Sequence, residues 1–109
     1  MLIRYYRTSS GREPVREYLS GLTARDQADA AFDLELIERL GLPGAPVVTR
    51  HIEGKLWEIK TGAGRQQRIF YCIITGPVML LLHACKKQKT GSQPRDVEIA
   101  IKRMKEVLS

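Results

Sequence analysis

Basic side chains that could bind a phosphate are concentrated in the second half of the chain. Residues 50–109 hold twelve Lys and Arg against five Asp and Glu, a net charge of +7, whereas residues 1–49 hold six against seven, a net charge of −1. The most closely spaced candidates are Lys60, Arg68 and the run Lys86-Lys87-Gln88-Lys89. Such a basic surface attracts polyanions, but charge alone does not distinguish RNA from DNA or from an acidic protein.

RNA is the polyanion that we expect at this surface, and its 2′-OH is an internal nucleophile beside each phosphate. If the protein cleaves RNA without a metal, the reaction needs a base for the 2′-OH, cations that stabilise the phosphorane, and an acid for the departing 5′-oxygen. Arginine can donate two parallel hydrogen bonds to phosphate oxygens, and lysine adds point charge. The predicted catalytic residues are Lys60, Arg68, Lys86, Lys87, Glu58 and His83, and the predicted RNA contacts are Arg65, Phe70 and Lys89.

For some of these residues, a purely structural role is the alternative to a catalytic or RNA-binding role. We expect Lys60 or Glu58 as the base, yet Glu58 could equally form a cross-strand ion pair with a cation. His83 has the chemistry of a proton donor, but a lone histidine in a strand is more often structural. Phe70 would either stack on a base or cover the sheet.

The order of apolar patterns predicts an α+β fold. Pro14 suits the first turn of a helix, Thr23 is a predicted N-cap, and Gly41 lies just beyond the end of the helix that Thr23 begins. The predicted order is a strand, two helices, a mostly antiparallel β-meander and a last helix. The expected elements are strand 2–6, helix 14–19, a helix between 23 and 41, strands 47–49, 56–60, 68–74 and 78–84, and a helix that begins at Pro94.

Hairpin geometry predicts which side chains share a face of the sheet. A two-residue loop at 76–77 places Arg68 opposite Cys85 and Tyr71 opposite Leu82. One face then forms the core, and we expect the helices to pack on it. Its predicted members are Trp57, Ile59, Ile69, Tyr71, Ile73, Leu80, Leu82 and Ala84.

The other face gathers cations from three successive strands. If the loop at 61–67 pairs Lys60 with Arg68, these two residues and Lys87 lie at one edge of the same face. Like charges repel, and a bound anion would relieve that repulsion. The pattern therefore favours a phosphate site there over a merely solvated surface.

Length and composition narrow the class of protein. A chain of 109 residues, 43% of them hydrophobic, predicts one globular domain, residues 1–109. The two cysteines, Cys72 and Cys85, form no CxxC pair, so we expect neither a metal nor another cofactor. The longest apolar run, 78–82, is too short to cross a membrane, which predicts a cytoplasmic protein without a membrane partner.

The sequence resembles the RelE/HigB superfamily of bacterial toxins, in particular its phage-derived HigB-like branch. The resemblance covers nearly the whole chain and rests on three segments in order. They are Leu56-Trp57-Glu58-Ile59-Lys60, Arg68-Ile69-Phe70-Tyr71 and Leu81-Leu82-His83-Ala84-Cys85-Lys86-Lys87, followed by Pro94 and an amphipathic helix.

That resemblance implies a RelE-like fold and the toxin of a type II toxin-antitoxin system. Such a toxin cleaves mRNA on the ribosome without a metal and so inhibits translation. The implied partners are mRNA, the ribosome and a cognate antitoxin, a small helix-turn-helix protein, with DNA reached only indirectly through that antitoxin. Matched motif positions give Lys60, Arg68, Lys86 and Lys87 as site residues. The C-terminal Tyr or His of many members has no counterpart after Lys86, so the general acid stays unassigned, with His83 as one candidate.

Two other functions fit the same sequence. Within the same fold, a ParE-like protein inhibits DNA gyrase and is not a nuclease. A non-catalytic module could also use the basic face only to bind an acidic partner chain.

Overall fold

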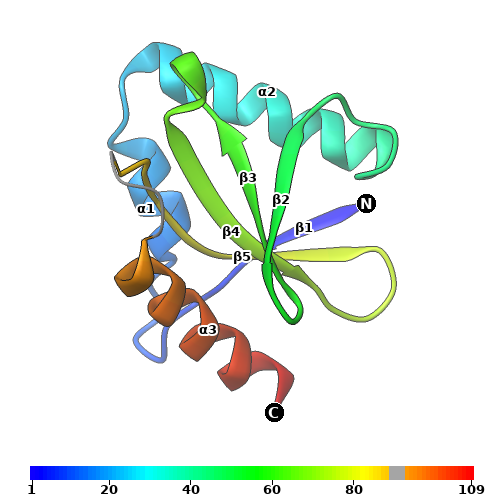
Figure 1. Cartoon of the computed structure of the whole chain (residues 1–109), viewed down its shortest axis with the longest axis vertical. Helices are drawn as coiled ribbons and strands as arrows, with labels where there is room; N and C mark the ends of the chain where they lie inside the picture. Colours follow the sequence, from blue (N-terminus) through cyan, green and yellow to red (C-terminus); the bar gives the residue numbers. More distant parts are fainter. Residues whose placement is uncertain (89–92) are drawn as a thin grey trace.

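Five strands form one mixed sheet in the computed structural model, which describes residues 1–88 and 93–109 (Figure 1). The strand order across the sheet is β1-β5-β4-β3-β2, with β1 parallel to β5 and the other neighbours antiparallel. The predicted α+β element order is confirmed. The elements are β1 (Leu2–Tyr5), α1 (Pro14–Ser20), α2 (Ala24–Leu40), β2 (Val48–Glu53), β3 (Leu56–Thr61), the short 3-10 helix η1 (Ala63–Arg65), β4 (Gln67–Ile73), β5 (Val78–Lys86) and α3 (Pro94–Leu108).

The ends of the helices follow from local chemistry. Pro14 and Pro94 stand at the first positions of α1 and α3, where a missing N–H costs no helical hydrogen bond. At the start of α2, the Asp26 amide donates to Oγ1 of Thr23 over 3.2 Å. Gly41 ends that helix with φ at 76°, a left-handed value that glycine adopts without steric cost.

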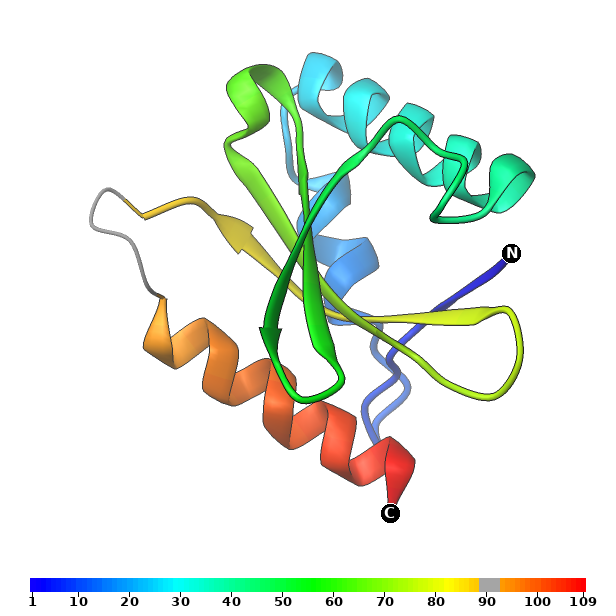
Figure 2. The ribbon, with the colours of Figure 1, turned by 45° about the vertical axis from the view of Figure 1, so that its right-hand side comes forward.

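The helices cover both faces of the sheet, which corrects the expectation that they pack on one face (Figure 2). Leu34 and Ile37 of α2 pack with Ile69 and Tyr71 on one side. Ala100 of α3 packs on the other side, against a second apolar cluster. That cluster includes Leu56, Phe70, Cys72, Leu80, Leu82 and Cys85. The second face is therefore charged at the end near the cations, and most of its remaining length is apolar and packed against α3.

A β-bulge in β5 explains a second difference from prediction. Phe70 pairs with His83 but Tyr71 pairs with Leu81, so β5 contributes one extra residue, Leu82, at this point. The extra residue moves Leu80 and Leu82 to the α3 face and leaves Leu81 on the α1/α2 face. Their predicted faces were therefore wrong, because a shift of one residue inverts every side chain beyond it.

The loop between β3 and β4 is fixed to α2. The Ala63 amide donates to Oδ1 of Asp26 over 2.7 Å, and Oγ1 of Thr61 donates to Oδ2 of Asp33 over 2.6 Å. Gly62 has φ at 80°, and a Cβ added there would lie 2.8 Å from Cγ of Gln67. Only glycine fits this close approach, so the loop that joins Lys60 to Arg68 has one well-defined path.

None of the helices in the described part of the chain is long and apolar enough to span a bilayer.

Candidate functional site

A small pocket with basic walls opens on the α3 face of the sheet. It encloses about 130 Å³ and is lined by Arg50, Glu58, Lys60, Arg68, Lys87 and Gln93. We call these six residues the cationic pocket. Its walls come from β2, β3, β4, the segment just after β5, and the residue that precedes α3. The pocket thus brings together three predicted cations, Lys60, Arg68 and Lys87, with Glu58.

Strand register explains why these side chains meet. Arg50 pairs with Glu58 in one row across the sheet, and Lys60 pairs with Arg68 in the row two residues further along. Directly opposed residues in antiparallel strands project to the same face, so both rows face the same side. The prediction that Lys60 and Arg68 are paired neighbours is confirmed.

Glu58 is the most unusual residue of the pocket because it is a fully buried carboxylate, with 0% of its surface exposed. Its Oε1 accepts a hydrogen bond from Nε of Arg50 at 2.9 Å and forms an ion pair with Nε of Arg68 at 3.6 Å. Its Oε2 is buried and has no hydrogen-bond partner among the described residues. Burying an ion costs several kcal/mol, which the two arginines offset, so an unused acceptor at this position invites a donor from a ligand.

Arg68 is buried and held rigidly, with only 6% of the residue's surface exposed. Its Nη1 donates to the carbonyl oxygen of Arg65, and it also lies 3.4 Å from the carbonyl oxygen of Gln67. Arg65 has φ at 55°, a left-handed value that is rare for a residue with a side chain. The strained turn therefore presents its carbonyl to Arg68 and fixes the guanidinium in the pocket.

The backbone after β5 is also anchored where it enters the pocket. The Lys87 amide donates to the carbonyl oxygen of Gln66 over 2.7 Å, and Nε2 of Gln93 donates to the carbonyl oxygen of Lys86 over 2.9 Å. Gln93 is the N-cap of α3, so that helix begins beside the pocket. The positive end of the helix dipole adds to the attraction for an anion.

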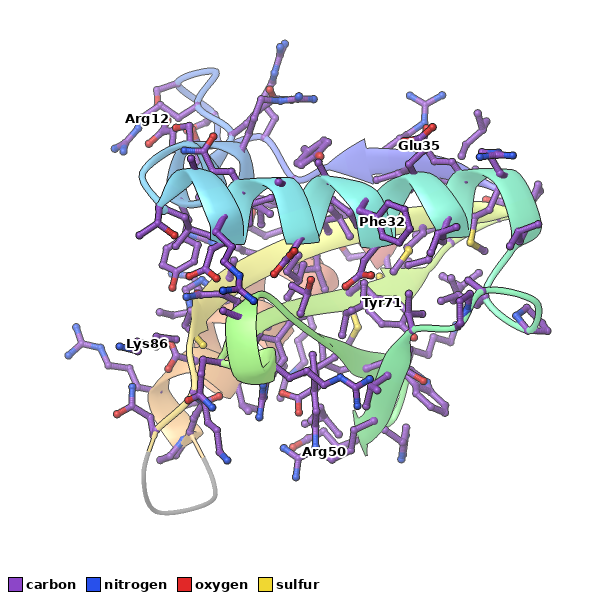
Figure 3. All side chains as sticks on the ribbon, turned by 90° about the horizontal axis from the view of Figure 1, so that it is seen from above. Arg12, Phe32, Glu35, Arg50, Tyr71 and Lys86 are labelled. Atoms are coloured by element: carbon purple, nitrogen blue, oxygen red, sulfur yellow. The ribbon has the colours of Figure 1, made fainter. Side chains whose placement is uncertain are left out.

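Several predicted site residues lie elsewhere. Lys86 pairs with Gln67 and so points to the opposite face from Lys87; Figure 3 shows it at one edge of the molecule. Arg65 lines a neighbouring pocket beneath α2. Phe70 is 1% exposed and packs under α3. The prediction that it stacks on an RNA base is therefore wrong, and it covers the sheet instead. Lys89 lies outside the described residues.

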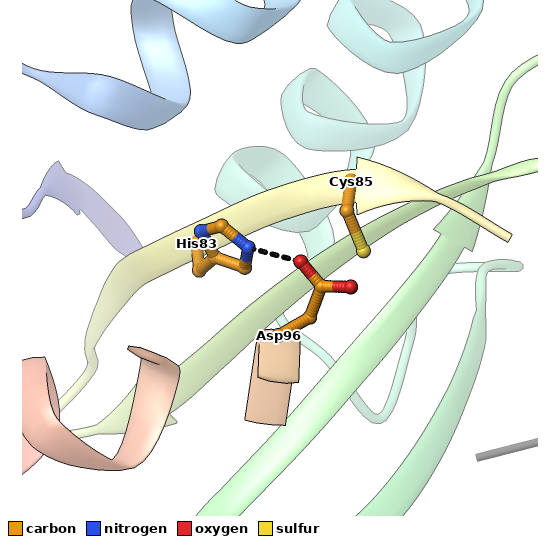
Figure 4. A group of neighbouring side chains, drawn as sticks. All are labelled: His83, Cys85 and Asp96. Carbon is orange, nitrogen blue, oxygen red and sulfur yellow. Dashed lines mark hydrogen bonds and ion pairs between the residues drawn. The ribbon is translucent and has the colours of Figure 1, made fainter. Parts of the chain in front are cut away.

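His83 belongs to a separate hydrogen-bonded network between β5 and α3 (Figure 4). Its Nε2 lies 2.7 Å from Oδ1 of Asp96, and Nη1 of Arg103 lies 3.3 Å from its Nδ1. Arginine can only donate, so Nδ1 accepts and the ring proton is on Nε2, which donates to Asp96. The ring also stacks on Phe70, with centroids 6.2 Å apart. His83 does not line the cationic pocket.

His83, Cys85 and Asp96 bring one candidate ligand atom each to within 4.8 Å of one another. Their chemistry nevertheless fits a hydrogen-bonded cluster better than a metal centre. Nε2 of His83 already carries the shared proton. Burial, together with the nearby Asp96 carboxylate, raises the pKa of the Cys85 thiol to about 12, whereas metals bind the thiolate.

The sequence matches the family model described as phage derived protein Gp49-like (DUF891) over residues 17–105. That match covers most of the chain and includes every residue of the cationic pocket. The chain belongs to the Gp49-like family. This family is related to the RelE and HigB proteins and is toxin-like, which agrees with the resemblance seen in the sequence at the level of the family. No curated protein matches the chain.

Two pocket residues of this Gp49-like protein were absent from the sequence prediction. Arg50 was missed because the second strand was expected to end at position 49, whereas β2 continues to Glu53. A strand long enough to pair with Glu58 would have placed Arg50 opposite it. Gln93 carries no comparable signal, since it reaches the pocket through the start of α3 and not through strand pairing.

Proposed function

We propose that this Gp49-like protein is a metal-independent endoribonuclease that cleaves mRNA as the toxin of a type II toxin-antitoxin pair. The observation that carries the proposal is the convergence of cations around one buried carboxylate. Counted formally, Arg50, Lys60, Arg68 and Lys87 place four positive charges beside the single negative charge of Glu58. The excess favours an anion, and a phosphodiester offers both an anion and, in RNA, an adjacent hydroxyl.

Glu58 is the proposed general base. Its Oε1 is engaged by the two arginines, its Oε2 is buried without a partner in the described structure, and Glu58 is one of the residues that line the pocket. A ribose 2′-OH that donates to Oε2 would satisfy this acceptor and be aligned to lose its proton. This observation favours Glu58 over Lys60, the other base that the sequence allowed.

Lys60, Arg68 and Lys87 are the proposed phosphate ligands. As the 2′-oxygen attacks phosphorus, its proton passes to Glu58, and the three cations stabilise the charge that develops on the phosphorane. The bond from phosphorus to the 5′-oxygen then breaks, and that oxygen takes a proton from the ammonium group of Lys60 or Lys87. The products are a 2′,3′-cyclic phosphate and a 5′-hydroxyl, which balances the step without a metal.

Family membership supports the proposed setting. As a RelE/HigB-related toxin, the protein would act on mRNA at the ribosome and inhibit translation. A cognate antitoxin, a small helix-turn-helix protein, would neutralise it and would carry the only connection to DNA.

A matched pair of double variants tests this function in cells. Lys60→Ala with Lys87→Ala removes two lysines of the cationic pocket, while Lys55→Ala with Lys105→Ala removes two exposed lysines outside it. After induction, mRNA 5′ ends, translation and DNA replication are measured. We expect in-frame mRNA cuts with the wild type and the control, and a loss of roughly 100-fold or more in the pocket variant.

Other outcomes identify other functions. Intact mRNA with stalled DNA replication would replace the nuclease with a gyrase inhibitor. Absence of any growth effect from wild-type protein would indicate a non-catalytic basic module. Equal loss of cleavage in both double variants would show that total charge matters and that the cationic pocket does not.

A further inference from the structure

A second pocket lies beside the cationic pocket and shares one wall with it. It encloses about 200 Å³ between α2 and the β3–β4 loop, and Asp29, Phe32, Lys60 and Arg65 are among its lining residues. We call it the α2 pocket. It is smaller than the roughly 300 to 1,000 Å³ of sites that enclose a drug-sized ligand, which suits a single flat ring system. Because Lys60 lines both pockets, the two pockets adjoin at the end of β3.

Phe32 is an aromatic side chain that the protein core does not explain. It is 61% exposed although it lies in the middle of α2, and it projects from that helix as Figure 3 shows. Leaving a phenylalanine in water forgoes the stabilisation that burial would give. At the rim of a pocket next to a phosphate site, its ring offers a stacking platform for a base of single-stranded RNA.

Asp29 places a carboxylate in the α2 pocket. Asp33, one turn later, is engaged by Thr61, whereas Asp29 makes no side-chain hydrogen bond or ion pair within residues 1–88 and 93–109. A carboxylate repels the RNA backbone, so the favourable guest is a base edge that carries N–H donors. Guanine alone among the four bases presents two adjacent donors, N1–H and the exocyclic amine, to the two oxygens of a carboxylate.

The two pockets are also joined through the backbone. Arg65, which lines the α2 pocket, accepts a hydrogen bond from Arg68 in the cationic pocket through its carbonyl oxygen. The same turn is fixed to α2 by the bond from the Ala63 amide to Asp26. The spacing between the pockets is therefore set by the fold before any RNA binds.

We propose that the α2 pocket binds a guanine base of the mRNA, at a fixed position beside the phosphate held in the cationic pocket. The proposal rests on the nuclease function above and adds the base preference to it. Phe32 stacks on the base, Asp29 accepts from its Watson–Crick edge, and Lys60 bridges the base site and the phosphate site.

Four alanine variants on one helix test the proposal. Asp29→Ala and Phe32→Ala alter the α2 pocket, while Glu35→Ala and Leu40→Ala alter exposed residues of α2 outside it. Alanine is the best helix former, so all four should fold, which thermal unfolding checks. The full chain is induced in cells, and the base frequency at each position around the mRNA cuts is compared with that of uncut mRNA.

We expect wild type and both controls to enrich guanine roughly tenfold at one fixed position beside the cut. Asp29→Ala should abolish the enrichment while cuts continue, and Phe32→Ala should reduce cutting at all sites by roughly tenfold. Cuts without guanine enrichment in the wild type, or enrichment that survives Asp29→Ala, would overturn the base site and leave the nuclease standing. Absence of cuts in the wild type would instead refute the nuclease function.

A protein-docking role for Phe32 is distinguished by the same variants. If Phe32→Ala cuts mRNA like the wild type but no longer responds to a coexpressed antitoxin, then Phe32 is a protein contact and the base site is refuted.

Discussion

Nη1 of Arg103 donates to the carbonyl oxygen of Leu82 over 2.9 Å, and Leu82 is the extra residue of the β5 bulge. A bulge leaves a backbone group without its ladder partner, and here α3 supplies the partner from outside the sheet. The same Nη1 contacts Nδ1 of His83. One arginine therefore connects α3 to the place where the register of β5 changes.

Replacement of Arg103 should loosen this attachment. We expect Arg103→Met to lower the free energy of unfolding by about 1–3 kcal/mol, because a carbonyl in a partly buried position loses its donor while the apolar stem is retained. Urea unfolding followed by circular dichroism measures the change. Arg95→Met, at an exposed position in the first turn of the same helix, is the control. Equal stability of the two variants would contradict the prediction.

Glu58→Gln should separate catalysis from binding. The amide is close in shape to the carboxylate but is a far weaker base, so we expect cleavage to fall by roughly 10²- to 10⁴-fold. Loss of the negative charge should leave binding of a non-cleavable 2′-deoxy oligonucleotide unchanged or tighter at low salt. Both are measured at a temperature where circular dichroism shows the folded state. Loss of binding in step with loss of cleavage would show that Glu58 only supports the pocket.

The stability of the protein should fall in alkaline solution, in part through Cys85. Burial raises the pKa of its thiol from 9.0 to about 12, so the folded state holds this proton more tightly than the unfolded state does. The resulting stabilisation is complete below about pH 9 and is lost as the pH rises toward 12. Tyr71, whose pKa burial raises to about 12, contributes in the same direction.

Urea midpoints between about pH 8 and pH 10.5 test this linkage. The wild type should lose more stability over that range than Cys85→Ala or Tyr71→Phe, each of which removes one titrating group. A pH dependence that is identical in all three proteins would refute the assignment.

His83→Phe tests whether the histidine takes part in proton transfer. Phenylalanine preserves the stack on Phe70 but loses the bonds to Asp96 and Arg103. Because His83 does not line the cationic pocket, we expect cleavage close to the wild-type rate and a stability lower by about 1–2 kcal/mol. A rate loss of roughly 100-fold or more in the folded variant would restore His83 as the acid.

Short-range signals in the sequence predicted the elements well. Thr23 and Gly41 mark the ends of α2 through capping chemistry that depends only on neighbouring residues. The pairing of Arg68 with Cys85 was also predicted correctly. Two differences from the expected register of β4 and β5 cancel each other before this pair is reached. The loop between β4 and β5 is one residue longer than expected, and the bulge at Leu82 restores the register before Arg68 is reached.

Contacts between elements that are far apart in the sequence were harder to predict. The burial of Phe70 and the placement of α3 on the second face depend on how a 15-residue helix returns to the sheet, which strand alternation does not encode. Lys86 and Lys87 look equivalent as neighbours in sequence, yet the end of β5 sends them to different sides. Arg50 lines the pocket because β2 continues to Glu53, beyond the apolar residues from which a strand over 47–49 was predicted.

The bulge also has a practical consequence for labelling the protein. The bulge at Leu82 separates the register of the β4–β5 turn from the pairing of Arg68 with Cys85. Residues 75–77 of that turn are exposed and lie at the opposite end of the hairpin from the cationic pocket. A fluorophore or affinity handle attached there would report on the intact molecule while leaving its basic pocket free.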